Sequence, residues 1–203
     1  MKLHTVDLRL VLGLVLAHFL LFFSFSERSI FWYIFAASIL MLIAYATFQG
    51  EVDDEVSFFS YIFFGILSGV LLFAVIWLAY KGIQLFHLPF ESSVGRLYRW
   101  YAPSAFWEFL ALILVAAPGE EFFWRGFIQK RLMKKFNPFA SILLGAVLYA
   151  SVQIYSGQLL LILAALFTGF VWGWLYFKKK SMPLVIVSHL IFDVLLFILI
   201  PLK

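Results

Sequence analysis

The chain has 203 residues, of which 65% are hydrophobic and 13% are charged, and its mean hydropathy is +1.02. This small number of polar residues cannot cover the surface of a soluble globule. The composition therefore indicates a polytopic membrane protein. The net charge is +4, and there is no cysteine. The lack of cysteine excludes disulfides, thiolate nucleophiles and sulfur-ligated metal sites.

Seven segments are long and apolar enough to cross a membrane, which takes about 20 residues of helix. We therefore expect an all-α polytopic bundle of seven transmembrane helices that forms a single domain, 1–203. Within it we separate an N-terminal three-helix part (1–80), an interfacial segment (81–104) and a C-terminal part (105–203). The expected spans are 8–25, 30–48, 58–80, 106–127, 138–154, 159–177 and 183–202.

The first apolar segment is similar to a signal peptide, but Asp7 and Arg9 crowd its start and Ser24 to Ser26 is a poor cleavage site. We interpret it as an uncleaved span. Segment 81–104 mixes aromatic and cationic residues, which is typical of the headgroup interface. We expect this segment to lie on the membrane surface; the alternative is a lid or substrate-entry element over a site in the following helices.

Basic residues gather in two clusters that flank the later spans, 130–135 and 178–180. With the N-terminus in the cytoplasm, that side collects nine lysine and arginine residues, including Lys2, against five on the other, including Lys203. The positive-inside rule therefore favours an integral plasma-membrane protein with a cytoplasmic N-terminus. The acidic loop at 51–55, which begins with Glu51, lies on the same side. The clusters are short and juxtamembrane, so we expect them to meet lipid headgroups and not nucleic acid.

Ionisable residues are almost absent from the first three spans. His18 is the exception, and we interpret it as a packed, hydrogen-bonded histidine and not as a ligand. Burying a charged group at mid-bilayer depth costs roughly 2.5–3.5 kcal/mol, so such residues usually pair, face a cavity or do chemistry. Polar groups enter the membrane at three places in the second half: Glu120 and Glu121 with Arg125, Tyr149 with Gln153, and His189 with Asp193.

Spacing along a helix predicts which of these groups meet. Glu121 and Arg125 are four residues apart and should form an internal ion pair. Glu120 is about 100° around the helix from Glu121, so the same guanidinium cannot serve both carboxylates equally well. A carboxylate held in an apolar pocket is a competent general base if water reaches it. Pro118 removes a backbone donor and would kink the helix, opening a notch for that water.

His189 and Asp193 are also four residues apart, in the last span. They should project from one face, either as a hydrogen-bonded pair or as donors aimed at a shared pocket. Gly169 and Gly173 have the same spacing in the span before, which permits close approach of a neighbouring helix in lipid.

Taken together, the three sites resemble a known family. The pattern Glu-Glu-x-x-x-Arg, then an aromatic-x-x-x-polar site, then His-x-x-x-Asp, over about 117–195, is similar to that of the CPBP intramembrane endopeptidases, also called the CAAX protease or bacteriocin-processing (Abi) family. Phe123 and Gly126 fit the first motif as well. The resemblance implies hydrolysis of a membrane-proximal peptide, without a cofactor, in a bacterial plasma membrane.

By this resemblance Glu120 is the water-activating base, Glu121 and Arg125 are its supporting pair, and His189 with Asp193 stabilises the oxyanion. Two positions depart from the family pattern. Gln153 stands where the second motif has a histidine, and an amide can orient a water molecule but cannot accept its proton. Asp193 stands where many relatives have an amide, and a carboxylate there would repel an oxyanion unless it is protonated or paired with the histidine.

These departures leave three hypotheses open. The first is an active or slow glutamic protease, and the second is a catalytically silent relative that acts as a membrane scaffold, chaperone or immunity partner. The third is transport through a polar path, against which no inverted repeat is visible. The expected partners are membrane lipid and a peptide or membrane protein. The acidic and histidine side chains could ligate a metal, but without His-Glu-x-x-His and with one histidine at the site we expect none.

Overall fold

The computed structural model describes residues 7–48 and 53–202, and these are helical throughout apart from short connections. Within the described residues, six helices are long and apolar enough to cross a membrane, or seven if a bent helix pair counts as one span. This confirms the prediction of an all-α polytopic bundle. Lys2, Glu51 and Lys203, which entered the charge argument, lie outside the described residues.

Helix boundaries follow the predicted spans closely. The main differences are the third helix, which runs five residues further into the segment expected at the interface, and the fourth, which runs to Leu132. The helices are α1 (Leu8–Ser26), α2 (Phe31–Thr47), α3 (Phe58–Leu85), α4 (Glu91–Tyr101), a composite helix from α5 (Phe106–Ala111) through α6 (Ala117–Glu121) to α7 (Lys130–Leu132), α8 (Pro138–Val152), α9 (Leu159–Lys179) and α10 (Met182–Val194).

The helix starts are fixed by local chemistry. Asp7 caps α1 by accepting a hydrogen bond from the Leu10 amide, and Asn137 caps α8 in the same way, just before a proline that needs no amide partner. Ser181 caps α10. Between α9 and α10, Lys180 adopts a left-handed conformation with φ of 44°, which ends α9 sharply.

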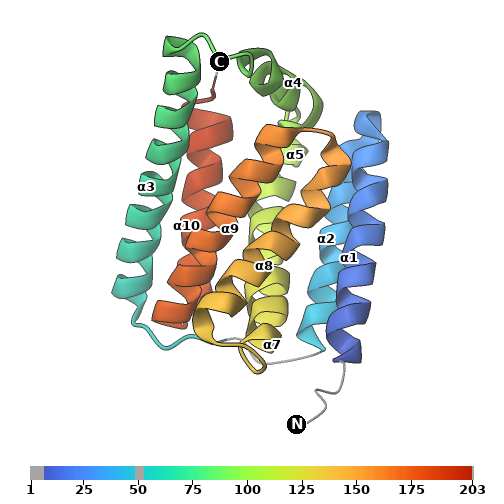
Figure 1. Ribbon diagram of the computed structural model, residues 1–203, viewed down its shortest axis with the longest axis vertical. Helices are drawn as coiled ribbons and strands as arrows, with labels where there is room; N and C mark the ends of the chain where they lie inside the picture. The colour runs from blue at the N-terminus through green and yellow to red at the C-terminus, as the bar shows by residue number, and fades with distance from the viewer. Residues whose placement is uncertain (1–6, 49–52, 203) are drawn as a thin grey trace.

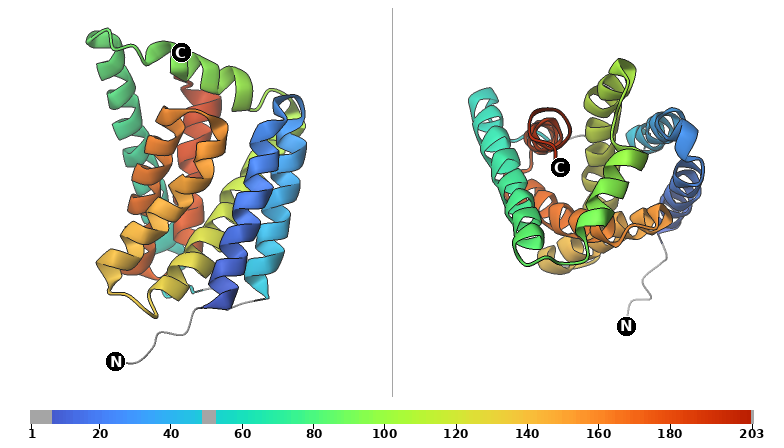
Figure 2. Two further views of the ribbon diagram at one scale, coloured as in Figure 1. Left: turned by 45° about the vertical axis from the view of Figure 1, so that its right-hand side comes forward. Right: turned by 90° about the horizontal axis from the view of Figure 1, so that it is seen from above.

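The composite helix 106–132 runs through the middle of the bundle (Figure 1). On one side of it α1 packs against α2, and on the other α3 packs along α10, while α8 and α9 form a hairpin. The first three helices therefore lie on two sides of the bundle. Helix α4 crosses one end of the bundle, and its axis makes an angle of 99° with the composite helix (Figure 2).

Glycines allow the closest helix contacts. A Cβ atom added at Gly169 would lie 2.9 Å from the ring of Tyr149 on α8, and one at Gly173 would lie 2.7 Å from a side-chain oxygen of the composite helix. This confirms the close approach predicted for that pair. The sequence did not predict a still tighter contact: a Cβ at Gly69 of α3 would lie 2.5 Å from the carbonyl oxygen of Ser188 on α10.

The acidic loop binds the basic residues at the opposite end from α4, which we call the ionic end. The Asp53 carboxylate accepts hydrogen bonds from Lys130 and from the Tyr176 hydroxyl, both at 2.7 Å. These basic residues are therefore used, at least in part, to hold the ends of helices together. Two further ion pairs at the ionic end are Arg131–Asp7 at 2.8 Å and Lys180–Glu55 at 3.2 Å.

Candidate active site

The first motif lies on an irregular part of the composite helix. Two widened π-helical stretches, Leu112–Ala116 and Phe122–Gln129, flank the short α6. Pro118 lacks an amide hydrogen, and a π turn is one way for a helix to absorb the missing bond. The predicted disturbance at Pro118 thus takes the form of widened turns on both sides of the acidic pair.

Glu121 is the centre of a buried ionic group. Its Oε1 accepts from Arg125 Nη1 at 3.1 Å, the predicted internal pair, and also lies 2.8 Å from His189 Nδ1. Arg125 Nη2 donates to the carbonyl oxygen of Gly169 at 3.1 Å. Glu121 is fully buried, and its second oxygen has no partner among the described residues. The carboxylate therefore links the first motif to the third, a connection between helices that spacing alone did not predict.

The His189 ring is held from three directions. Besides Glu121 at Nδ1, it has Asp193 Oδ2 at 3.6 Å from Nε2, on the face that the spacing predicted. It also stacks on the indole of Trp172, with ring centroids 3.9 Å apart and an angle of 24°. Trp172 Nε1 in turn donates to Ser188 Oγ at 3.1 Å. Trp172 was missed, because a tryptophan in a chain this rich in aromatic residues gives no signal of its own.

Glu120 has a partner that the sequence did not assign. The Tyr149 hydroxyl of α8 donates to Glu120 Oε2 at 2.7 Å. The ring of Tyr149 also lies 4.9 Å from the Arg125 guanidinium, a cation–π distance. Tyr149, the first residue of the second motif, therefore orients the Glu120 carboxylate, which takes no part in the Glu121–Arg125 ion pair.

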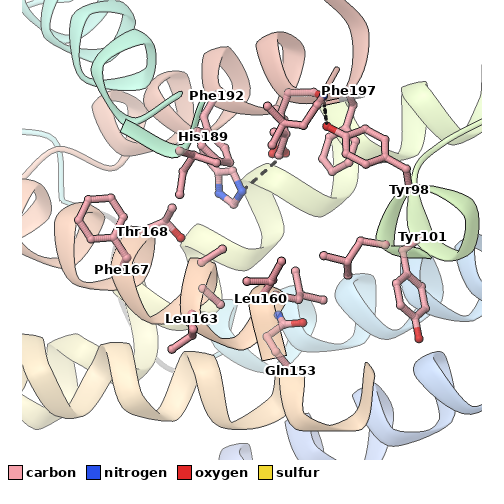
Figure 3. A pocket seen from close by; sticks show the side chains of 18 of the residues that line it. Tyr98, Tyr101, Gln153, Leu160, Leu163, Phe167, Thr168, His189, Phe192 and Phe197 are labelled. Atoms are coloured by element: carbon pink, nitrogen blue, oxygen red, sulfur yellow. Dashed lines mark hydrogen bonds and ion pairs between the residues drawn. The ribbon is translucent and has the colours of Figure 1, made fainter. Parts of the chain in front are cut away.

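The polar groups face a common cavity of about 510 Å³. Its lining includes Glu120, Tyr149, Gln153, His189 and Asp193, whereas Glu121 and Arg125 are buried and do not line it. The rest of the lining is mostly aliphatic and aromatic. Figure 3 shows the Gln153 amide and the His189 ring on different sides of this cavity. All six residues proposed from the sequence thus come together, four on the wall and two in support.

Helix α4 covers one end of the cavity. Tyr98 and Tyr101 line the cavity from this helix (Figure 3). The Tyr98 hydroxyl donates to the carbonyl oxygen of Leu196 at 2.7 Å and accepts from the Leu202 amide at 3.0 Å. Those bonds tie α4 to the end of the last span. This is the place where the alternative interpretation of segment 81–104 puts a lid.

Two other expectations concern His18 and metal binding. His18 Nδ1 lies 2.9 Å from the Tyr155 hydroxyl and its Nε2 lies 3.2 Å from Ser151 Oγ, so the interpretation of a packed, hydrogen-bonded histidine is confirmed. For metals, the described residues contain no group of three or more His, Asp and Glu side chains that could hold an ion. That no metal or cofactor is used stays a prediction.

Comparison with known proteins agrees with this geometry. Residues 102–195 match the model of the type II CAAX prenyl endopeptidase Rce1-like family. This segment, a little under half of the chain, is similar to the CAAX protease family. No curated protein and no solved structure matches the chain. The matched segment runs from just before the composite helix into the last span and includes all six site residues. At the level of the family, the match supports a CAAX protease-type membrane endopeptidase.

Proposed function

We propose that this protein is an intramembrane glutamic endopeptidase in which Glu120 activates a water molecule against a peptide bond. One observation supports this above the others. A single, largely apolar cavity inside a membrane bundle has on its wall a carboxylate, oriented by Tyr149, and a histidine, oriented by Glu121. Burying ionisable side chains at membrane depth is costly, so proteins retain them there mainly where they serve a function.

The Glu120 carboxylate has the capacity for this role. Its Oε2 accepts the Tyr149 hydroxyl, and its Oε1 is left for a water molecule. As the water oxygen attacks the carbonyl carbon, the carboxylate takes the water proton and then delivers it to the leaving amine as the C–N bond breaks. The charge that develops on the carbonyl oxygen needs a donor nearby.

In this proposal, His189 is that donor. A doubly protonated ring donates from Nδ1 to Glu121, while at 3.6 Å its Nε2 is too far from Asp193 for a hydrogen bond. The Nε2 proton is therefore available to a developing oxyanion, with Asp193 balancing the imidazolium charge. Stacking on Trp172 fixes the plane of the ring, so the donor is held in place before reaction.

Gln153 favours a second candidate function. Its amide cannot accept a proton, so Glu120 has to act as the only base, and loss of a positioned acid or base typically lowers a rate about 10²- to 10⁴-fold. A catalytically silent relative that binds another membrane protein as a scaffold, chaperone or immunity partner would keep the same fold. In that case the cavity would hold its partner without cleaving it.

One comparison separates the two functions. Strains with the wild-type protein, with no protein, and with Glu120→Gln at matched expression are compared by mass spectrometry of membrane-protein and secreted-peptide termini. Glu120→Gln keeps an acceptor for Tyr149 but removes the base, so we expect the same termini to vanish as in the strain without the protein. Glu91→Gln, at the exposed start of α4, is the matched control. If Glu120→Gln behaves as wild type while the strain without the protein differs, the protein acts by binding.

A further inference from the structure

Gln153 is a buried residue whose side chain has no hydrogen-bond partner among the described residues. It is 5% exposed, lines the cavity, and none of its amide atoms bonds to another described residue. Its backbone oxygen accepts from Ser156 Oγ at 2.6 Å, so only the side chain is left unsatisfied. A polar group that faces an apolar cavity without a partner gains from any ligand that supplies the missing hydrogen bonds. An amide held in this state inside an apolar cavity is available to a ligand.

Thr168 of α9 is in the same condition. Its side chain is 3% exposed and lines the same cavity. A threonine within a helix commonly bonds a carbonyl of its own helix, but the Thr168 hydroxyl has no partner in the described part of the chain. Figure 3 shows Thr168 and Gln153 reaching the cavity from two different helices. The cavity therefore offers one amide and one hydroxyl, both unused by the protein.

The position of Gln153 places its ligand beside Glu120. Gln153 follows Tyr149 by four residues at the end of α8, so the two side chains leave the helix on nearly the same face, one turn apart. Tyr149 is hydrogen-bonded to the Glu120 carboxylate. A group bound by Gln153 would thus lie next to the proposed base and opposite the His189–Asp193 pair.

The chemistry of a primary amide selects the class of ligand. It presents a donor and an acceptor side by side, and its complement is a group that offers one acceptor and one donor with the same spacing. A backbone peptide group does so, whereas a phosphate offers acceptors, an ammonium offers donors, and a hydrocarbon chain offers neither. A peptide group inside a helix has already used both partners, so the group has to belong to an extended segment.

We propose that Gln153, assisted by the Thr168 hydroxyl, binds a backbone peptide group of an extended, apolar substrate segment next to the bond that is cleaved. The inference rests on the proposed function for the identity of that bond. It gives the glutamine in the second motif a binding role in place of proton transfer. It also defines the substrate class as a peptide that enters the cavity unwound and not as a helix.

Binding can be tested without turnover. The full chain with Glu120→Gln is reconstituted in lipid nanodiscs and titrated with a short, terminally blocked apolar peptide that carries a dansyl group. Analogues replace each backbone amide in turn by an ester, which keeps the shape but removes the N–H donor. Because a neutral hydrogen bond contributes about 0.5–1.5 kcal/mol, we expect one analogue to bind about two- to tenfold more weakly than the parent peptide.

The variant Gln153→Leu shows whether this loss belongs to Gln153. We expect it to weaken binding of the parent peptide by a similar factor and to abolish the difference between the parent and that one ester. Thr168→Val should lower affinity by a smaller factor. Gln158→Leu makes the same chemical change at a buried glutamine that does not line the cavity and should bind as the parent protein does, which controls for misfolding.

Two results would overturn the proposal: no saturable peptide binding to the Glu120→Gln protein, or an ester effect that persists in Gln153→Leu. Failure of the proposed function gives a different result, because membrane proteins and secreted peptides would then keep their uncleaved termini in cells that contain the wild-type protein. The ester effect could still be present in that case. Gln153 would then bind the backbone of a partner peptide that is not cleaved.

Discussion

Ion pairs occur at two places in this bundle, and the two differ in how far they are removed from water. In the buried group, the side chains of Glu121 and Arg125 are 0% and 2% exposed, and each has further polar partners. At the ionic end, the Lys130 and Asp53 side chains are 28% and 32% exposed. The loss of an ion-pair partner should therefore affect stability differently in the two places. A buried charge depends on its partners, whereas water can replace a partner at the ionic end.

The largest difference is expected from removing one cation in each place. Arg125→Met leaves Glu121 buried without its guanidinium, which should lower the free energy of unfolding by about 3–5 kcal/mol. Lys130→Met, which removes a partly exposed cation, should cost no more than about 1 kcal/mol. Denaturant unfolding of both variants in the same detergent measures the two values. Equal losses would show that burial does not separate the two groups.

The contacts within single helices were predictable from the sequence. The spans follow from hydropathy, and the Glu121–Arg125 and His189–Asp193 pairs follow from helical spacing. In both cases the partners belong to the same helix, so the period of 3.6 residues suffices to bring them together. The ionic end shows the opposite case, since its pairs join different helices and loops.

The partners that meet between helices were not predictable. Glu121 and His189 are 68 residues apart in the chain, and helical period indicates which face a residue occupies without indicating the neighbour that it meets. For the same reason, the sequence did not predict the Tyr149–Glu120 bond, the Trp172–His189 stack or the packing of α3 on α10. Only the resemblance to a family placed the three motifs in one site, and it could not show that the Gln153 amide lacks a protein partner.

A substitution inside the cavity should change turnover more than stability. Gln153→His restores a group that can accept a proton, so kcat should rise about tenfold or more if the missing base limits the reaction. The same change removes the amide proposed to bind the substrate backbone, so KM should rise as well. Steady-state cleavage of a peptide found by the comparison of termini measures both constants. A lower kcat with unchanged KM would contradict both roles.

At the ionic end, acid should remove a specific contribution to stability. Burial raises the pKa of the Asp53 carboxyl, but the hydrogen bonds from Lys130 and Tyr176 and the positive charges nearby outweigh it, so this pKa lies below its ordinary value of 3.8. A lowered folded-state pKa stabilises the protein above the unfolded-state value, and the contribution is lost as the pH falls through the folded-state value.

Asp53→Asn isolates that contribution. At pH 7 the variant should be less stable than wild type by about 1 kcal/mol or less, because water partly screens the pair. As the pH falls from about 4 through the lower pKa of the folded protein, the difference should vanish, since wild type then also has a neutral side chain. Thermal unfolding over a pH series measures it. A difference that persists in acid would mean that the charge of Asp53 is not what stabilises the loop.

The smallest effect is expected at Glu55, whose side chain and that of Lys180 are each 60% exposed. Glu55→Gln should change the free energy of unfolding by less than about 0.5 kcal/mol, and high salt should remove that difference. The loop does not depend on this charge, because the Glu55 amide donates to the Lys180 carbonyl oxygen at 2.9 Å and the Met182 amide donates to that of Asp53 at 2.8 Å. Unfolding of wild type and variant at low and high salt measures the effect. A loss comparable to that of Arg125→Met would mean that the ion pair, and not the backbone bridge, holds the ionic end together.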